Sequence, residues 1–217
     1  MRRLIIICEG ETEQEFCKDV LSPFLAQKQI FIDTPRIKKT RGGIADWSVI
    51  KKEVETYLRQ DTAVFVTTLM DYYGLMEKHQ FPEWDRAEQV MDKSIRMGIL
   101  EQGMKDSLSP ELQSRFIPYI QLHEFEALLF TNKEVLLNSF LPREIKDQAY
   151  LEETFREQNP EMINNGRTTA PSKRLERSIE GYNKVLYGSM IASEIGLENI
   201  MAACPRFAVW VGKLKSL

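Results

Sequence analysis

The chain has 217 residues, enough for one large domain with a substantial buried core. Hydrophobic residues make up 43% and charged residues 28%, a globular composition that excludes disordered, collagen-like and disulfide-rich classes. The formal net charge of -3 argues against a surface coated in basic residues for bulk nucleic-acid binding, but it leaves room for a local basic groove.

The three cysteines, Cys8, Cys17 and Cys204, are odd in number and lack the spacing of a metal site. They lie among apolar residues, so we expect reduced, buried thiols, as is usual in the cytosol. No apolar stretch approaches the length of a membrane span, and the apolar run after Arg2-Arg3 is too short for a signal peptide. The sequence therefore predicts a soluble, cytoplasmic protein with no membrane partner.

Residues 4–8 form an uninterrupted apolar run rich in β-branched side chains, which is typical of a strand buried on both faces. An acidic turn that begins with Glu9 follows it. Thr12 and Glu15 have the spacing of a helix-capping box, and the helix is predicted to end near Gln29. This order places Glu9 at the carboxyl end of a central strand, where open α/β sheets bind their ligands.

The acids of this turn differ in how easily they are explained. Glu13 falls in the first turn of the predicted helix, where the helix dipole favours a negative charge. Glu9 directly follows buried residues and is crowded by like charges, an arrangement that raises pKa values or requires a cation. Hard divalent cations prefer carboxylate oxygens, and Mg2+ usually takes one or two of them from a protein. Helix capping therefore explains Glu13 but not Glu9.

An edge strand and a helix are predicted next. Residues 30–32 and 35–39 indicate a more polar strand at the edge of the sheet, followed by a basic loop that contains Arg41. Asp46 is placed to cap the following helix. That helix has an apolar stripe for the core, made of Trp47, Ile50, Val54 and Leu58.

A second strongly apolar run, residues 63–70, also ends in an acid, Asp71. The carboxyl ends of neighbouring parallel strands lie at the same edge of a sheet. Glu9 and Asp71 are therefore predicted to converge on one ion.

A third strand is predicted at residues 115–122. Before it, a helix is predicted over residues 85–97 and continues through a less defined segment to residue 108. The third strand too leads into acids, Glu124 and Glu126. Positions two apart share a face on a strand but point well apart on a helix. Because a break into helix is expected near this point, at most one of the two acids should reach the shared site, with Glu124 ahead of Glu126.

A helix is predicted to begin at Ser172, and Lys173 and Arg174 fall in its first turn. Basic residues at that position oppose the helix dipole, which indicates either contact with phosphate or simple solvation of the charge. Lys184 is a further candidate for phosphate contact.

The acids at the strand ends resemble those of the Toprim superfamily, the metal-binding fold of topoisomerases, primases and related nucleases. In that family a Glu followed by a Gly ends the first strand, as Glu9-Gly10 does here. The branch of overcoming-lysogeny-defect nucleases extends the motif to Glu-Gly-x-x-Glu, which this chain matches through Glu13. A later strand of the family ends in Asp-x-Asp; Asp71 matches the first Asp, whereas Tyr73 replaces the second.

More narrowly, the chain resembles an uncharacterised bacterial family, domain of unknown function 4276, which is grouped with Toprim-like proteins and covers essentially the whole chain. Residues 71–74, 123–128 and 171–184 carry this resemblance. It implies a Toprim-like α/β fold, with a mostly parallel central sheet flanked by helices and a helical C-terminal part. We expect residues 1–130 to form that core and residues 131–217 to form a helical extension packed on it, in a single compact unit.

The resemblance also implies a phosphoryl-transfer site that holds Mg2+ or Mn2+. In such sites carboxylates hold the ion, and the ion polarises the phosphate and lowers the pKa of an attacking water. Glu9, Asp71 and Glu124 are the predicted ligands of one ion, with Glu13 and Glu126 as supports for a second.

Basic residues are predicted to act beside the metal. Lys173, Arg174 and Lys184 are expected to stabilise charge on the phosphate, and Arg41 to contact nucleic acid. His123 is predicted either as an acid or base or as a hydrogen-bonding group behind the ligands. The candidate catalytic residues are Glu9, Asp71, His123, Lys173 and Lys184.

Three functions are compatible with these features. The leading hypothesis is a Mg2+-dependent nuclease or phosphodiesterase. The resemblance to the narrower family, whose members tend to be encoded beside an AAA-type ATPase, implies that it is the effector of such an ATPase in bacterial defence against foreign DNA. The second is a non-catalytic module that binds a metal or nucleotide within an ATPase complex, which Tyr73 favours. The third, a purely structural partner of an ATPase, leaves clustered acids without an ion, which is costly. The substrate stays open between DNA, RNA and a small nucleotide.

Overall fold

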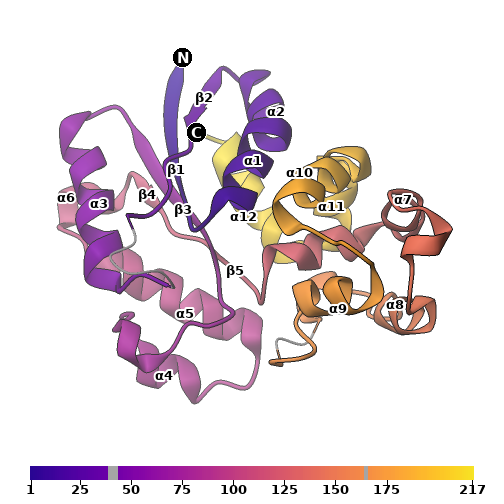
Figure 1. The fold of residues 1–217 in the computed structure, drawn as a ribbon. Coiled ribbons are helices and arrows are strands. Elements are labelled where there is room, and N and C mark those ends of the chain that lie inside the picture. Colours follow the sequence, from indigo (N-terminus) through magenta and orange to yellow (C-terminus); the bar gives the residue numbers. More distant parts are fainter. Residues whose placement is uncertain (39–43, 164–165) are drawn as a thin grey trace.

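The computed structural model describes residues 1–38, 44–163 and 166–217. Among them, strands pair in the order β2-β1-β3-β4, β5 also pairs with β3, and neighbouring strands of the sheet are parallel (Figure 1). The strands are β1 (Arg2–Cys8), β2 (Ile30–Asp33), β3 (Phe65–Asp71), β4 (Phe116–Ile117) and β5 (Ile120–Gln121). The predicted α/β class, a mostly parallel sheet flanked by helices, is confirmed.

The apolar run of β1 is continuous because helices cover both faces of the sheet. Leu4, Ile6 and Cys8 belong to the buried cluster on one face, whereas Ile5 and Ile7 belong to the cluster on the other. This is the alternation that a strand imposes on successive side chains. Because both faces of the strand are buried, apolar and polar residues do not alternate in its sequence.

The first face is covered by helices from both ends of the chain (Figure 1). They are α1 (Glu11–Phe16), a π-helical stretch (Cys17–Leu21), α2 (Ser22–Ala26), α10 (Lys184–Ile195), α11 (Leu197–Ala203) and α12 (Pro205–Lys215). The cluster also takes in apolar residues of α7 (Lys133–Asn138), α8 (Gln148–Thr154), α9 (Pro171–Ser178) and the 3₁₀ helix Phe125–Thr131. Residues on both sides of position 130 thus share one core.

The other face is covered by the middle of the chain. Its helices are α3 (Trp47–Gln60), α4 (Trp84–Glu88), α5 (Lys93–Asp106) and α6 (Pro110–Gln113). The predicted stripe of α3 is buried as expected, but Asp46 makes no side-chain capping hydrogen bond at its start. Short 3₁₀ helices complete the fold at Glu77–His79, Pro142–Glu144 and Pro160–Met162.

Two predicted elements are each divided in the structure. The helix expected over residues 85–108 is interrupted at residues 89–92, and α5 restarts there because Asp92 Oδ1 accepts a hydrogen bond from Ile95 N at 3.0 Å. The third strand is split at Pro118, which has no N–H to donate to a neighbouring strand. Thr68 bridges that gap, since its hydroxyl both accepts from Tyr119 N and donates to Tyr119 O.

Trp210 connects the C-terminal helix α12 to the sheet. Trp210 Nε1 donates to Thr67 Oγ1 of β3 at 2.9 Å, and its ring stacks on Tyr119 with centroids 4.5 Å apart. These contacts fix the last helix against the middle strand of the sheet. Pro205 is the first residue of α12, a position where its missing N–H is not needed.

Helix α10 approaches α1 closely because residue 188 has no side chain. A Cβ on Gly188 would lie 2.8 Å from Thr12 Cγ2 and 3.2 Å from Phe125 Cε1. Thr12 is a buried residue inside α1, which begins after Gly10, so the predicted capping box at Thr12 is wrong. Its methyl group instead forms the surface on which α10 rests.

Gly188→Ala is expected to destabilise the protein by about 1–3 kcal/mol, because the new methyl group overpacks this contact. The clash outweighs the gain of about 1 kcal/mol that Ala has over Gly in a helix. Gly98→Ala on α5 is the matched control: an added Cβ meets nothing within 4 Å there, so it should stabilise. Urea unfolding of both variants tests this, and equal gains in stability would contradict the close approach.

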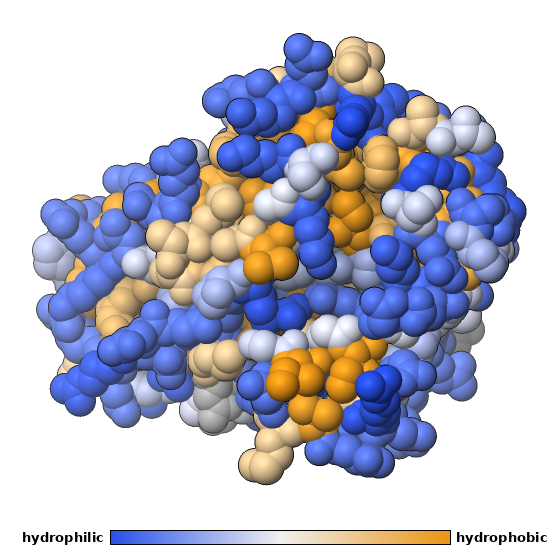
Figure 2. All heavy atoms as spheres, turned by 180° about the vertical axis from the view of Figure 1, so that it is seen from behind, coloured by the Kyte–Doolittle hydropathy of each residue, from blue (hydrophilic) through white to orange (hydrophobic). Residues whose placement is uncertain are grey.

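Among the described residues, no helix combines the length and the apolar character needed to cross a bilayer. Figure 2 shows the face opposite to that of Figure 1 as largely hydrophilic, with apolar residues in separate groups.

Candidate active site

The first two acids of the candidate site lie where the order of the strands in the sheet reverses. The chain leaves β1 toward β2 on one side and later returns as β3 on the other, so β1 and β3 flank the topological switch point. Glu9 follows β1 and Asp71 ends β3. Glu9 Oε2 accepts a hydrogen bond from Asp71 N at 3.0 Å, so the structure brings the two residues together.

Asp71 also connects the sheet to the segment that carries the next acids. Its Oδ1 atom accepts from Phe125 N at 2.9 Å, at the start of the 3₁₀ helix Phe125–Thr131. Two residues beyond the ends of β3 and β5, Tyr73 N donates a hydrogen bond to the carbonyl oxygen of His123 at 2.8 Å. Two strand ends are thus joined by backbone hydrogen bonds directly behind the acids.

Glu13 lies over Gly10, which explains the spacing of the Glu-Gly-x-x-Glu motif. A Cβ on residue 10 would lie only 2.9 Å from Glu13 Oε2, so a glycine leaves room for this carboxylate. Glu13 is buried on α1, in the first turn of the helix. The motif therefore places its second acid back over the turn that carries the first.

Glu124 has an unexpected partner in α9. One carboxylate oxygen accepts from Ser172 N at 2.8 Å and the other accepts from Ser172 Oγ at 3.0 Å. Ser172 was predicted to start this helix as a cap, but it lies inside the first turn, and Glu124 takes the capping role from a distant segment. These two bonds anchor α9 beside the segment that follows β5. Figure 1 shows α9 next to that segment.

Five acids share one electrostatic environment. Burial raises the pKa of Asp71 well above its usual value, and four negative charges raise it further: those of Glu13, Glu9, Glu126 and Glu124. Both acids after β5 therefore contribute to the raised pKa of Asp71. Glu124 is extended and directly precedes the 3₁₀ helix that contains Glu126. That at most one of the two reaches the shared site stays a prediction.

The pKa of Glu126 is strongly raised. Burial and the charge of Glu124 raise its pKa to about 8, even though the Lys184 ammonium lowers it. Like charges that are held together in a buried place attract a proton or a cation. The charge and the oxygen donors of these acids therefore suit the binding of a hard divalent cation.

Lys184 is the basic residue that faces these acids. It begins α10, whose start is capped by Asn183 Oδ1 through Val185 N and Leu186 N. Burial lowers the pKa of Lys184, but the carboxylates, Glu126 first among them, raise it by more. The close approach at Gly188 brings this end of α10 over α1.

The other basic residues are placed differently. Lys173 is exposed and pairs with Glu176 Oε2 at 2.6 Å, yet it lies near enough to Glu124 for that charge to contribute to its raised pKa. Arg174 donates to Thr169 O and to Thr154 Oγ1, and so ties α9 to α8. The predicted phosphate contacts of both stay predictions. Arg41 lies outside the described residues.

His123 turns away from the acids. It is fully buried with a positive φ of 66°, and its Nε2 lies 3.3 Å from Lys93 Nζ on α5. Burial and then the Lys93 charge lower its pKa to about 3, so the ring is neutral near pH 7. Its predicted acid–base role stays a prediction, and the sequence offered no signal for its contact with Lys93.

The acids are close together but do not form a ready-made metal site. Among the described residues, no three His, Cys, Asp or Glu side chains are grouped so that they could hold an ion. Several oxygens already accept hydrogen bonds: one each of Glu9 and Asp71 from backbone N–H groups, and both of Glu124 from Ser172. The charge and donor type fit Mg2+ or Mn2+, but binding requires these side chains to rotate.

The model of one protein family, Domain of unknown function (DUF4276), matches residues 8–215. The chain belongs to this family. No curated protein and no solved structure matches the chain. The matched range includes every acid of the candidate site and Lys184.

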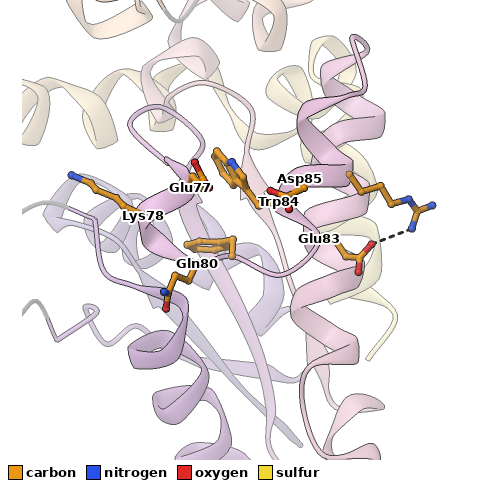
Figure 3. A pocket seen from close by; sticks show the side chains of 8 residues that line it. Glu77, Lys78, Gln80, Glu83, Trp84 and Asp85 are labelled. Atoms are coloured by element: carbon orange, nitrogen blue, oxygen red, sulfur yellow. Dashed lines mark hydrogen bonds and ion pairs between the residues drawn. The ribbon is translucent and has the colours of Figure 1, made fainter.

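The DUF4276 domain also has a wide concavity that these acids do not line (Figure 3). Its volume is about 870 Å³, and the residues around it come from the segment after β3 and from α4. Side chains of both charge signs surround it, and Glu83 there pairs with Arg86 at 3.3 Å. This mixed lining gives no convergent set of catalytic groups, so the candidate site remains at the strand ends.

In EDTA, the stability of the DUF4276 domain is expected to fall as the pH rises from about 5 to about 8. The pKa of Glu126 is about 8 in the folded chain, against an ordinary value of 4.5. The folded state therefore keeps a proton that the unfolded state has already released, and each step upward in pH favours unfolding. Glu126→Gln cannot ionise, so it should flatten this dependence.

Urea unfolding at about pH 5 and pH 8 measures this effect. Glu194→Gln, a change at an exposed position of α10, is the matched control and should leave the pH dependence as in wild type. Equal pH dependence in wild type and Glu126→Gln would contradict the raised pKa.

Proposed function

We propose that this chain is a phosphodiesterase of the Toprim type that requires Mg2+ or Mn2+ and cleaves nucleic acid. The observation that carries the proposal is the group of acids at the β1/β3 switch point, in which burial and mutual charge raise the pKa values of Asp71 and Glu126. Open α/β sheets bind their ligands at this place. The order β2-β1-β3-β4, with Glu9-Gly10 after β1 and Asp71 ending β3, supports the Toprim comparison.

Glu9, Asp71 and Glu126 are the proposed ligands of the ion, and Glu13 supports them from α1. A bound divalent cation would polarise the phosphodiester and lower the pKa of an attacking water. Glu124 acts differently: its bonds to Ser172 hold α9, and with it Lys173, at the edge of the site.

Lys184 is the proposed phosphate-binding residue. Its ammonium group lies within the electrostatic influence of the same carboxylates, which raise its pKa. A positive charge there stabilises the charge that develops on the phosphate during cleavage.

The proposed biological role is that of an effector of an AAA-type ATPase in defence against foreign DNA. The resemblance described for residues 71–74, 123–128 and 171–184 motivates this role. Co-expression with an ATPase of that class, followed by size-exclusion chromatography, tests it, and separate elution of the two proteins would count against it.

A second function, a module that binds a metal or nucleotide without turnover, is favoured by two observations. Tyr73 replaces the second Asp of the Toprim pattern. In addition, the described acids are not grouped to hold an ion as they stand. Metal binding without cleavage of any nucleic acid would decide for this alternative.

The cleavage test compares wild type with Glu9→Gln on single- and double-stranded DNA and RNA, with Mg2+, Mn2+ or EDTA. Wild type should cleave only with a divalent metal, and Glu9→Gln should lose at least about 100-fold in rate, because a metal ligand is removed. Gln keeps an oxygen that can accept from Asp71 N, so the fold should survive, as circular dichroism can check. Unaltered cleavage by Glu9→Gln would overturn the assignment.

A further inference from the structure

One of the three tryptophans of the chain has no hydrogen-bond partner for its indole N–H. Trp47 Nε1 donates to Ser107 Oγ at 3.1 Å. Trp210 Nε1 donates to Thr67 Oγ1 at 2.9 Å. Trp84 Nε1, in contrast, is buried and meets no acceptor among the described residues. Because buried indole N–H groups usually find a partner, this donor indicates an acceptor that the chain itself does not supply.

Trp84 begins α4 and lines the concavity of about 870 Å³ that follows β3. Figure 3 shows its indole reaching from the start of that helix toward Glu77 on the facing segment. Trp84 is 8% exposed, so its indole lies just beneath the surface of the concavity. Glu77 at the rim is exposed, and exposed side chains change rotamer within nanoseconds. The donor therefore belongs to a concavity of the size in which proteins bind ligands, about 300–1,000 Å³.

The backbone around this concavity is held in a conformation that its residues rarely adopt. Gln80 and Glu83 have φ values of 53° and 61°, in the left-handed region that favours glycine. The ring of Phe81, between them, lies 5.7 Å from the ring of Trp47. Helix α5 approaches so closely that a Cβ on Gly103 would lie 2.8 Å from Glu83 Cγ. Strained residues fixed by packing are typical of ligand-binding segments, and a rigid site loses less entropy when it binds.

The charges around the concavity show which kind of ligand it favours. The charged residues that line it are Glu77, Lys78, Glu83, Asp85 and Arg86. Glu83 pairs with Arg86 at 3.3 Å. Glu77, Asp85 and Lys78 make no ion pair among the described residues. The unpaired charges are thus two acids and one lysine, which favour a basic ligand over the phosphates of a nucleic acid.

We propose that this concavity binds a basic, proline-rich segment of a partner protein. The indole N–H requires a carbonyl oxygen that is not already hydrogen-bonded, whereas helices and sheets use theirs internally. A polyproline II helix has no internal hydrogen bonds, so its carbonyls are free to accept from Trp84. Such segments bind in grooves lined by aromatic residues, here Phe81 and Trp84, and Glu77 and Asp85 are placed to pair with their Lys or Arg. The inference goes beyond the metal site and does not depend on it.

Nitrogen-15 NMR of the three indole groups tests the inference, with a peptide that repeats Pro-Pro-Arg four times as the probe. The peptide should shift the Trp84 signal in a saturable way. The signals of Trp47 and Trp210 should stay in place, because these indoles already donate within the protein. Trp84→Phe assigns the signal, and circular dichroism checks that this variant folds. Its affinity for the peptide should fall by about 5- to 10-fold, as expected for the loss of one hydrogen bond.

Two further peptides separate the contributions of charge and conformation. A Pro-Pro-Glu repeat keeps the conformation and reverses the charge, and an Ala-Ala-Arg repeat keeps the charge without proline. Both should bind at least about 10-fold more weakly than the Pro-Pro-Arg repeat. Glu77→Gln should weaken binding of the Pro-Pro-Arg repeat by about 2- to 5-fold, since one rim charge is lost. Glu88→Gln, at an exposed position of α4, is the matched control and should bind as wild type does.

Several results would overturn the inference. The first is a Trp84 signal that does not move when the Pro-Pro-Arg repeat is added to wild type. Equal binding of either control peptide would contradict the assigned ligand, and so would a stronger response of Trp84 to a single-stranded DNA oligonucleotide. Shifts of all three indole signals would show a change of the whole fold instead of binding at the concavity. None of these results bears on metal binding or cleavage, so the proposed function is tested separately.

Discussion

Asp71→Asn is expected to stabilise the metal-free protein and, at the same time, to abolish its stabilisation by Mg2+. Burial and four neighbouring acids make the charge of Asp71 unfavourable, so removing it should raise the free energy of unfolding in EDTA. Asn can still present its Oδ1 atom to Phe125 N, so the link to the 3₁₀ helix is kept. A loss of fold is therefore not expected.

The opposite effect on metal binding follows from the loss of a ligand. A metal that binds only the folded state stabilises wild type by about 2.7 kcal/mol at 100 times its dissociation constant. Asp71→Asn should show no such increase with either Mg2+ or Mn2+. Opposite signs for the two effects identify a residue that is kept for binding at the expense of stability.

Thermal melts in EDTA, Mg2+ and Mn2+ provide the measurement. Asp85→Asn, at an exposed acid on α4, is the matched control and should respond to metal as wild type does. A destabilised Asp71→Asn in EDTA would refute the electrostatic argument, and an unchanged metal response would remove Asp71 from the ligands. No metal response in wild type would leave the acids as a shell that has lost its ion.

Glu161→Ala is expected to destabilise the protein by about 3–5 kcal/mol. Glu161 is fully buried, and its two carboxylate oxygens accept from Arg206 N at 2.9 Å and from Phe207 N at 3.0 Å. These are among the first backbone N–H groups of α12, which have no partner inside the helix. Ala would leave two buried donors unpaired, each at a cost of about 1–3 kcal/mol, and would also open a cavity.

The size of this effect depends on how deeply α12 is packed. Phe207, Trp210, Val211 and Leu214 all belong to the buried cluster, whereas Pro205 at the start of the helix is exposed. Glu161→Gln keeps one acceptor oxygen and should cost less than Glu161→Ala. Glu194→Ala, at an exposed position, should change stability by less than about 0.5 kcal/mol. Urea unfolding gives all three values, and a loss below about 1 kcal/mol in Glu161→Ala would show that α12 does not need this cap.

Glu124 and Glu161 have the same structural role, and no local sequence pattern predicted it for either residue. Each is a buried acid that caps a helix from a distant segment: Glu124 at α9 and Glu161 at α12. Local capping patterns compare residues three positions apart, so they cannot detect a cap supplied from elsewhere. For that reason Ser172 was predicted as a cap although it is the recipient of one.

The strands and their acids, in contrast, were predictable because they depend on local chemistry. A strand covered on both faces must be apolar throughout, and β1 and β3 show this directly. Parallel strands end at one edge, so Glu9 and Asp71 had to be neighbours once both runs were assigned to one sheet. The division of the third strand at Pro118 was missed, because the apolar pattern continues across it.

The sequence by itself determined the α/β class and the placement of acids at the ends of β1, β3 and β5, since both follow from the periodicity and composition of short segments. Only the tertiary structure decided which groups face those acids. The charge of Lys184 lowers the pKa of Glu126, while His123 turns toward Lys93. These placements depend on how α9 and α10 pack against the sheet, through contacts such as Gly188 on Thr12 that no local pattern records.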